Sequence, residues 1–319
     1  MAINMPGVGS DIDEAARPDE VDAQDANGGG KRATRLSPSR LYLRRFLRNK
    51  PAVAGLFLFI LLVLLASTGR FFTDWNYEEA DFAALSVSPG TGGHLLGTNG
   101  AGNDVYAQLV HGLGRSLIIA VSVSLLTTAI AALFGTTAAY LGGRAERLML
   151  GFVHFLMILP SFLIIALVGT HYRGDWQVLV VVLTVFGWML TARVIWSLAT
   201  SLREREYVMA ARFMGVSALR TIVRHMVPNI GSLLIVTFTL GVASTVQAET
   251  ALSFIGFGVK QPDVSLGTML ADGQNTLSTA PWLFYCPAVL VVLLTVAMAL
   301  IGDGLRDALD PTSHSGGRA

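Results

Sequence analysis

Charged and small side chains gather in one short stretch of the chain, residues 201–229, which lies between long apolar runs. Ser201 and Glu204 have the Ser-x-x-Glu spacing of a capping box, which predicts that a helix begins there. Gly215 can take the left-handed conformation that ends a helix, and Ser217 can cap a second helix directly after it. The stretch therefore predicts two short helices joined by a glycine turn.

The two predicted helices differ in the surfaces that they offer. The second has apolar side chains three and four positions apart, which predicts an amphipathic helix with a stripe of Leu219, Ile222, Val223 and Met226. The first has small side chains at Ala210 and Ala211, which would let a partner approach closely, with Glu206 and Arg212 at the rim. Two interpretations stay open: a docking surface, or a solvated loop between two membrane spans, which charge alone favours.

Three single polar residues interrupt apolar runs, and each has a functional and a structural interpretation. Glu249 could meet the ammonium group of a substrate in a wet cavity, or backbone donors could hold it. Arg193 could extend to the headgroups or pair with an acid of another subunit. His154 could contact a ligand or bond to a neighbouring helix. After Glu249, Gly256 and Gly258 predict that the helix breaks, as in a re-entrant element.

Motifs for bond-breaking chemistry are absent from the sequence. It has no Gly-x-x-x-x-Gly-Lys-Ser/Thr phosphate loop, no His cluster with metal spacing, and no arrangement of nucleophile, His and acid. The single cysteine, Cys286, excludes an intrachain disulfide. We therefore expect no catalytic residue, no metal, no cofactor and no ATP hydrolysis by this chain.

The composition is that of an integral membrane protein with an all-α fold. Of 319 residues, 52% are hydrophobic and only 14% are charged, and the mean hydropathy is +0.56. A bilayer needs about 20 mostly apolar residues per helix. The six stretches that meet this requirement are residues 52–69, 113–140, 148–168, 177–198, 230–250 and 282–301. Pro160 predicts a kink in the third of these predicted spans.

The charges are distributed unevenly, and this distribution predicts the orientation. Most of the 23 Lys and Arg residues lie before residue 51, in the loops after the second and fourth spans, and at the C-terminal end. The positive-inside rule places these segments and both termini in the cytoplasm. The expected parts are a disordered cytoplasmic tail (1–30), a basic juxtamembrane segment (31–50), a first span with an external loop (51–112), a five-helix core (113–302) containing the loop 201–229, and a cytoplasmic tail (303–319).

Several motifs together resemble one family of transporters. One is the cytoplasmic EAA loop of ATP-binding-cassette (ABC) importer permeases, whose spacing is matched by Ala210, Ala211, Gly215, Val227 and Pro228. Met209 stands where that loop usually has its Glu. The fuller string at 203–229 and the segment from Gly302 to Pro311 resemble the C-type subunit of the dipeptide, oligopeptide and nickel permeases. The resemblance covers about residues 40–312.

The sequence departs from that family at pairs of positions. Asn99 and Asn103 replace an Asp and an Arg, and Gly151 and His154 replace an Arg and an Asp. Trp196 stands where a second Arg is usual. Because the charges are lost in pairs, the departures change local contacts and leave the resemblance intact.

The resemblance implies the transmembrane domain of a type I ABC importer in the bacterial inner membrane. Its partners would be a homologous B-type permease subunit, two ATP-binding-cassette ATPase subunits and an extracytoplasmic substrate-binding protein. ATPase coupling would fall to Glu206, Ala210, Ala211, Arg212, Gly215 and Pro228. The candidates for the substrate pathway are Glu249, His154 and Arg193.

The resemblance favours short peptides as the substrate, with nickel and glutathione as alternatives. An ion-coupled secondary transporter is a weaker alternative, because the spans contain few carboxylates for ion coupling. A membrane-embedded enzyme is weaker still, because no set of residues converges on a triad.

Overall fold

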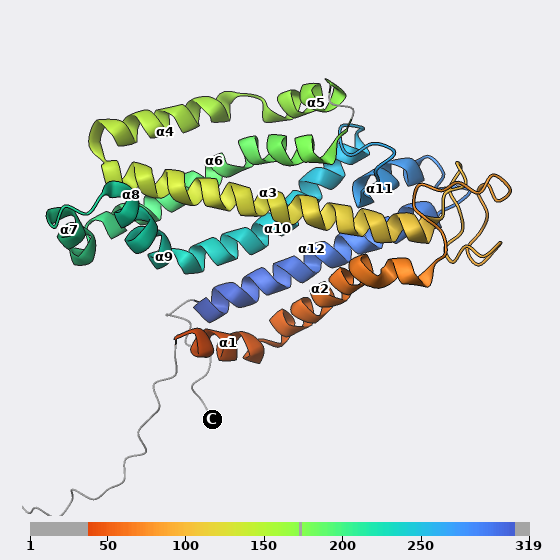
Figure 1. The fold of residues 1–319 in the computed structure, drawn as a ribbon, viewed down its shortest axis with the longest axis horizontal. Helices are drawn as coiled ribbons and strands as arrows, with labels where there is room; N and C mark the ends of the chain where they lie inside the picture. The colour runs from red at the N-terminus through yellow and green to blue at the C-terminus, as the bar shows by residue number, and fades with distance from the viewer. Residues whose placement is uncertain (1–37, 172–173, 310–319) are drawn as a thin grey trace, which may run out of the picture. The chain divides into compact units, whose positions relative to one another are not determined.

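The computed structural model describes residues 38–171 and 174–309, and every regular element in these ranges is helical (Figure 1). The predicted all-α fold is confirmed for this part of the chain. The predicted disordered tail at 1–30 and residues 310–319 lie outside the described residues. The elements are α1 (Pro38–Arg48), α2 (Lys50–Thr68), the 3-10 turn η1 (Gly69–Phe72), α3 (Val105–Leu141), α4 (Gly143–Ile158), α5 (Ser161–His171), α6 (Trp176–Arg203), α7 (Glu206–Phe213), α8 (Ala218–Thr221), the π-helical turn η2 (Ile222–Met226), α9 (Val227–Asn229), α10 (Gly231–Phe254), α11 (Leu266–Gln274) and α12 (Trp282–Leu309).

Among these residues, five helical segments are long and apolar enough to cross a membrane: α2 with η1, α3, α6, α10 and α12. A sixth crossing exists if α4 and the first part of α5 form one span, which is bent by 66°. The bend lies at Pro160, where the sequence predicts it, because proline has no N–H to donate and disfavours the helical conformation in the residue before it. Leu159 is accordingly extended, with ψ at 132°.

Two spans are longer than their apolar stretches predict. α3 has 37 residues, about 55 Å at 1.5 Å per residue, whereas the hydrocarbon core is about 30 Å thick. It begins at Val105, before the predicted residue 113, because the Asp104 carboxylate caps it by accepting the Ala107 N–H at 2.7 Å. α12 continues to Leu309, so residues 303–309 of the predicted C-terminal tail are helical.

Small residues bring the long helices close together. A Cβ atom added to Gly135 of α3 would lie 2.6 Å from the carbonyl oxygen of Ala192 and 2.9 Å from the nitrogen of Trp196, both on α6. Gly55 brings α2 equally close to α12, and Gly241 brings α10 close to α3. Such close backbone approach is typical of membrane helices, because lipid satisfies apolar side chains as well as a protein core does.

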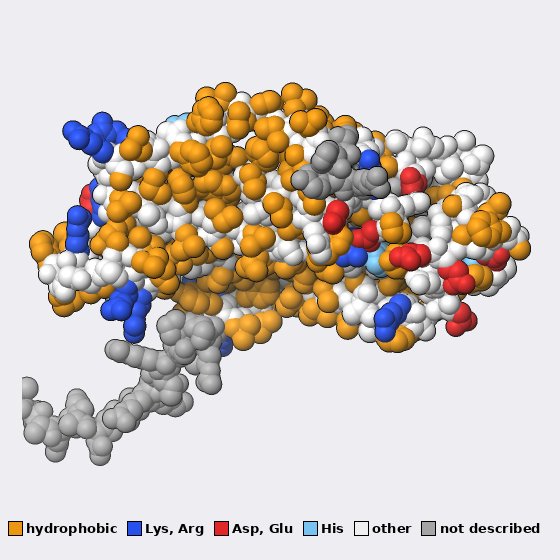
Figure 2. All heavy atoms as spheres, turned by 45° about the horizontal axis from the view of Figure 1, so that its top comes forward, with side chains coloured by type: hydrophobic (Ala, Val, Ile, Leu, Met, Phe, Trp, Pro, Cys, Tyr) orange, Lys and Arg blue, Asp and Glu red, His pale blue; other side chains and the backbone are white. Residues whose placement is uncertain are grey.

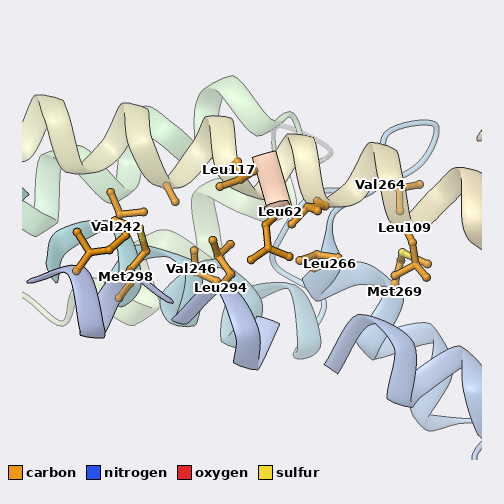
Figure 3. Packing of buried hydrophobic residues seen from close by; sticks show 14 of the residues in the cluster. Leu62, Leu109, Leu117, Val242, Val246, Val264, Leu266, Met269, Leu294 and Met298 are labelled. Atoms are coloured by element: carbon orange, nitrogen blue, oxygen red, sulfur yellow. The ribbon is translucent and has the colours of Figure 1, made fainter. Parts of the chain in front are cut away.

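The largest cluster of buried apolar side chains joins α2, α3, α10, α11 and α12. Figure 3 shows Leu117 of α3 facing Val246 of α10 and Leu294 of α12, with Leu62 of α2 beside them. Leu266, at the start of α11, is also fully buried in this cluster. The core therefore fixes α11 and the ends of α3 and α10 near one another.

Residues 73–104, between η1 and α3, form a cap with isolated bridges and no strand. His94 is fully buried in it, with Nδ1 2.8 Å from Asp104 Oδ2 and its ring stacked on Trp75 at 4.4 Å. Because Asp104 also caps α3, His94 ties the cap to the first turn of that helix. Gly97 and Gly102 have φ of +74° and +85°, a left-handed conformation that favours glycine, and both serve as turn residues of the cap.

Charged side chains lie mainly toward two ends of the surface in view, with a broad apolar belt between them (Figure 2). Lys and Arg side chains gather toward the end where α7 and α8 lie, and most of the acidic side chains in view lie toward the other end. This pattern is the one expected of a protein that spans a membrane.

We expect Gly135→Ala to weaken the contact between α3 and α6, because the added methyl group meets backbone atoms at 2.6 and 2.9 Å. Overpacking of this kind costs about 1–3 kcal/mol. Thermal unfolding of the purified protein in detergent should show a lower Tm. Gly151→Ala on α4 is the matched control, since its new Cβ would meet no atom within 4 Å. Equal Tm values for the two variants would contradict the packing argument.

Candidate coupling surface and buried carboxylate

The 201–229 segment folds into short helices, but the first does not begin at Ser201. α6 continues through Ser201 to Arg203, and the Ser201 hydroxyl donates to the carbonyl oxygen of Leu198 at 2.8 Å. The predicted capping box is therefore wrong: the Ser201 side chain bonds back into a helix that is already formed. α7 begins only at Glu206. The packing of α6 on α3 overrides the local capping signal.

The glycine turn is confirmed. Gly215 has φ of +74°, and an added Cβ atom would meet nothing within 4 Å. The turn thus depends on the conformational freedom of glycine and not on close packing. Ser217 precedes α8 at the predicted capping position, although its side chain makes no capping hydrogen bond.

The predicted apolar stripe of the second helix is divided between two faces. Ile222 and Met226 are buried, whereas Leu219 and Val223 are exposed. The reason is the π-helical turn at Ile222–Met226, which has more residues per turn and shifts the register of the side chains. The prediction that these four side chains form one apolar face is therefore wrong.

Buried side chains anchor this segment on the ends of α3 and α6. Val208 of α7 packs with Ile222 and Met226 in one cluster. Their partners in this cluster are Ala139, Tyr140 and Ala199. α9 then leads through a single residue, Ile230, into α10. The segment is thus fixed to α3 and α6 by packing and to α10 by the chain.

The structure places most of the predicted coupling residues on the surface. Glu206, Ala210, Arg212, Gly215 and Pro228 are exposed, but Ala211 is 3% exposed and faces the core of the chain itself. The small side chain at Ala211 therefore allows α7 to pack closely on its own protein.

Three large apolar side chains around the glycine turn are exposed; the sequence analysis did not single out the first two, and it expected the third in the apolar stripe of the second helix. Phe213 is 88% exposed, Met214 75% and Leu219 70%. We call Phe213, Met214 and Leu219 the apolar coupling patch. Their place near Gly215 could have indicated this exposure, because a turn directs the neighbouring side chains away from the core.

A contact that the sequence did not predict joins α4 to α6 beside this segment. Trp196 of α6 donates its indole N–H to Glu146 of α4 at 2.7 Å. Arg203 lies 3.8 Å from the other oxygen of Glu146 and donates to the carbonyl oxygen of Ala139 at 3.2 Å. The tryptophan that replaces the usual arginine thus joins α4 to α6 by a neutral donor.

Glu249 lies at the other end of α10, 1% exposed. Its Oε1 accepts the hydroxyls of Ser253 at 2.7 Å and Ser265 at 2.6 Å, and its Oε2 accepts the Ser116 hydroxyl at 3.2 Å. These contacts join α10 to α3 and to the start of α11. They fit the structural interpretation of Glu249, although hydroxyls take the place of the expected backbone donors. α10 ends at Phe254, before the left-handed Gly256.

The other two pathway candidates lie elsewhere. His154 is exposed on α4 and Arg193 is exposed on α6. The hydrogen-bond partners of Glu249 are serines, so neither His154 nor Arg193 shares a polar cluster with it. The three residues therefore form no common site. Among the described residues, no group of three or more His, Cys, Asp or Glu could hold a metal ion.

A charged cluster near the cap was also missed. Asp263 contacts Arg115 Nε and His111 Nε2, each at 2.7 Å. Tyr77 stacks on His111 with ring centres 3.6 Å apart, and the hydrogen bond of its hydroxyl to Glu78 raises the pKa of Tyr77 to about 12. The Tyr77 hydroxyl therefore stays protonated at physiological pH. Asp263 lies 152 residues from His111, so no local pattern reveals the pair.

Comparison with known proteins gives consistent matches over most of the chain. Residues 130–314 match the family model of the binding-protein-dependent transport system inner membrane component, and residues 37–89 match the N-terminal TM domain of oligopeptide transport permease C. The oligopeptide transport system permease protein OppC of Mycobacterium tuberculosis (strain ATCC 25618 / H37Rv) is 46% identical over 277 residues, which are 86% of this chain and 95% of that protein.

Two further relatives carry the same name. OppC of Bacillus subtilis (strain 168) is 31% identical over 92% of this chain and 95% of its own length. OppC of Escherichia coli (strain K12) is 33% identical over 84% of this chain and 89% of its own length. The matches include the segment that holds the coupling patch and the segment that holds Glu249.

We expect Glu249→Leu to lower the Tm of the protein in detergent by several degrees, because three buried hydroxyls lose their acceptor. Each unsatisfied buried group costs about 1–3 kcal/mol. Glu249→Gln keeps one oxygen as an acceptor and should cost clearly less. If Glu249 instead binds substrate, Glu249→Gln would abolish transport while both variants keep the Tm of the unchanged protein, and that result would contradict the structural role.

Proposed function

Because this chain belongs to the family of binding-protein-dependent transport system inner membrane components, we propose that it forms half of the translocation pathway of an ATP-driven importer of short peptides. The observation that carries the proposal is the apolar coupling patch, which lies on the loop that resembles the family's ATPase-docking motif. In a loop that only faces water, the Phe213 side chain at 88% exposure contributes no hydrophobic stabilisation. A docking surface gains from burying it.

The substrate follows from the names of the relatives. Proteins that align with 84% to 92% of this chain are named as oligopeptide permeases, and one relative from Brucella suis is named as a putative peptide permease. These names support peptides over the nickel or glutathione that other members of the wider family carry.

The distribution of charges supports the orientation that we propose. Basic residues of α1, of the start of α4 and of the coupling segment lie on the same side of the predicted spans. The positive-inside rule puts that side in the cytoplasm of a bacterial cell, with both termini. The cap and α11 then face the outside, where a substrate-binding protein would deliver the peptide.

Energy would come from two separate ATPase subunits, because the chain has no phosphate loop. Closure of the ATPases would push on the coupling patch. The buried cluster that holds α7 and η2 passes this push to α3 and α6, and Ile230 passes it to α10. Movement of these helices as rigid bodies would open the pathway alternately to each side. A second, homologous permease subunit would supply the other half.

We expect Phe213→Ser to release the ATPase subunits from the solubilised complex. Burial of one Phe contributes about 1.5–3 kcal/mol, so the dissociation constant should rise about tenfold or more. The measurement is the amount of ATPase that co-purifies with this chain, together with its ATP turnover.

The matched control is Phe82→Ser in the cap, because Phe82 is 83% exposed and lies on the proposed outer side. It should leave the co-purified ATPase unchanged. Full ATPase capture by the Phe213 variant, or equal losses in both variants, would argue against docking at the patch.

A further inference from the structure

Two adjoining hollows open beside α11, at the same end of the chain as the cap. One, of about 250 Å³, lies between the end of α10, the 259–264 loop and α11. The other, of about 300 Å³, lies between cap residues 99–101, α3 and α11. Gln108, Gln261 and Asp272 line both, so the two adjoin and share part of their walls. We call the pair the outer hollow.

The outer hollow contains two opposite charges that do not pair with each other. Asp272 and Lys260 both line the first hollow, yet neither forms an ion pair or a side-chain hydrogen bond within residues 38–171 and 174–309. Asp263, which also lines it, is by contrast already paired with Arg115 and in hydrogen-bond contact with His111. Asp272, Lys260 and Gln261 are all exposed at the mouth of the hollow, and partial desolvation by the surrounding walls still raises the pKa of the Asp272 carboxyl. A cationic group of a ligand would relieve that cost.

The uncharged lining of the outer hollow fits peptide groups. Gln261 offers an amide donor and an acceptor, and its side chain makes no hydrogen bond within the described residues. Gln108, by contrast, already accepts from Asn99 at 3.3 Å and donates to the Tyr77 carbonyl oxygen at 3.5 Å. Gln261 therefore offers an unpaired amide in the same hollow as an unpaired carboxylate and an unpaired ammonium, the three kinds of partner that the ends and the main chain of a short peptide need.

We propose that the outer hollow binds the two charged ends of a short, unmodified peptide on its way into the translocation pathway. Asp272 takes the terminal ammonium group, Lys260 takes the terminal carboxylate, and Gln261 bonds to a main-chain amide. The inference rests on the proposed importer function and orientation. A metal ion fits less well, because only one carboxylate is unpaired and Lys260 would repel a cation.

The outer hollow is connected to the helices that the coupling segment moves. Ser253 lines the hollow and donates its hydroxyl to Glu249 of α10 at 2.7 Å. α10 runs from this point back to α9 and the coupling segment. A tilt of α10 would therefore change the floor of the hollow, which gives the bound peptide a route to release.

The test uses the complete importer in lipid nanodiscs and a tripeptide with a photoreactive diazirine in its central side chain. The tripeptide is made with free ends, with an acetylated N-terminus, or with an amidated C-terminus. After illumination, mass spectrometry measures the label on residues 99–108 and 259–276. The unchanged protein should label about tenfold less with the acetylated peptide, because a charge-assisted hydrogen bond is lost.

Substitutions in the protein, combined with the blocked tripeptides, complete a double-mutant cycle. Asp272→Asn should lower labelling by the free tripeptide about tenfold, and acetylation should then lower it no further. Lys260→Gln should show the same dependence on amidation, which keeps the test valid if Asp272→Asn folds poorly. Glu79→Gln, which removes an exposed carboxylate of the cap outside the hollow, should label like the unchanged protein.

Two outcomes would overturn the proposal. The first is equal labelling of the unchanged protein by the free tripeptide and the tripeptides with a blocked end. The second is that blocking an end of the tripeptide lowers labelling of the Asp272 or Lys260 variant by as much as it lowers labelling of the unchanged protein. ATP-driven uptake of the free tripeptide, measured on the unchanged complex, separates this proposal from the proposed function. If labelling depends on the free ends of the tripeptide as expected but no uptake occurs, peptide binding in the outer hollow stands and the importer function is rejected. Uptake without that dependence would retain the importer and reject the hollow.

Discussion

The hydrogen bonds of Glu249 determine how one end of this molecule is built. A carboxyl group at 1% exposure inside a spanning helix is tolerated only if its oxygens are fully bonded. Ser116 and Ser265 each serve twice, because they donate to Glu249 and accept a backbone N–H, from Leu266 and Thr268 respectively. The same network therefore fixes α3 to α10 and caps α11. The outer hollow beside α11 exists because this cap holds the helix in place.

The opposite end is built by packing and not by a polar network. Gly135 lets α3 and α6 approach to backbone contact, and the cluster around Tyr140 and Met226 seats the coupling segment on their ends. α10 connects the two ends, since it begins after the coupling segment and carries Glu249 near its other end. Under the proposed mechanism, a displacement at the apolar coupling patch would reach the outer hollow through α10. The proposed coupling of ATP hydrolysis in separate subunits to transport requires a connection of this kind.

Much of the fold follows from local patterns in the sequence. Apolar length predicts the spans, Pro160 predicts the bend, and Gly215 predicts the turn, because each of these effects acts within a few residues. The failures have tertiary causes. Ser201 does not begin a helix because α6 is already stabilised by α3, and the stripe from Leu219 to Met226 divides because a π-helical turn shifts its register. Neither partner of Glu249 outside α10 could be predicted, since Ser116 lies 133 residues away and Ser265 follows an irregular loop.

The most direct measurement is uptake of a radiolabelled short peptide by proteoliposomes that contain this chain with the proposed second permease and ATPase subunits, with the proposed substrate-binding protein added outside. Uptake should require both the binding protein and ATP at the ATPase side, and a non-hydrolysable ATP analogue should stop it. Uptake by this chain alone that follows an imposed proton gradient and ignores ATP would contradict the importer function and favour an ion-coupled transporter.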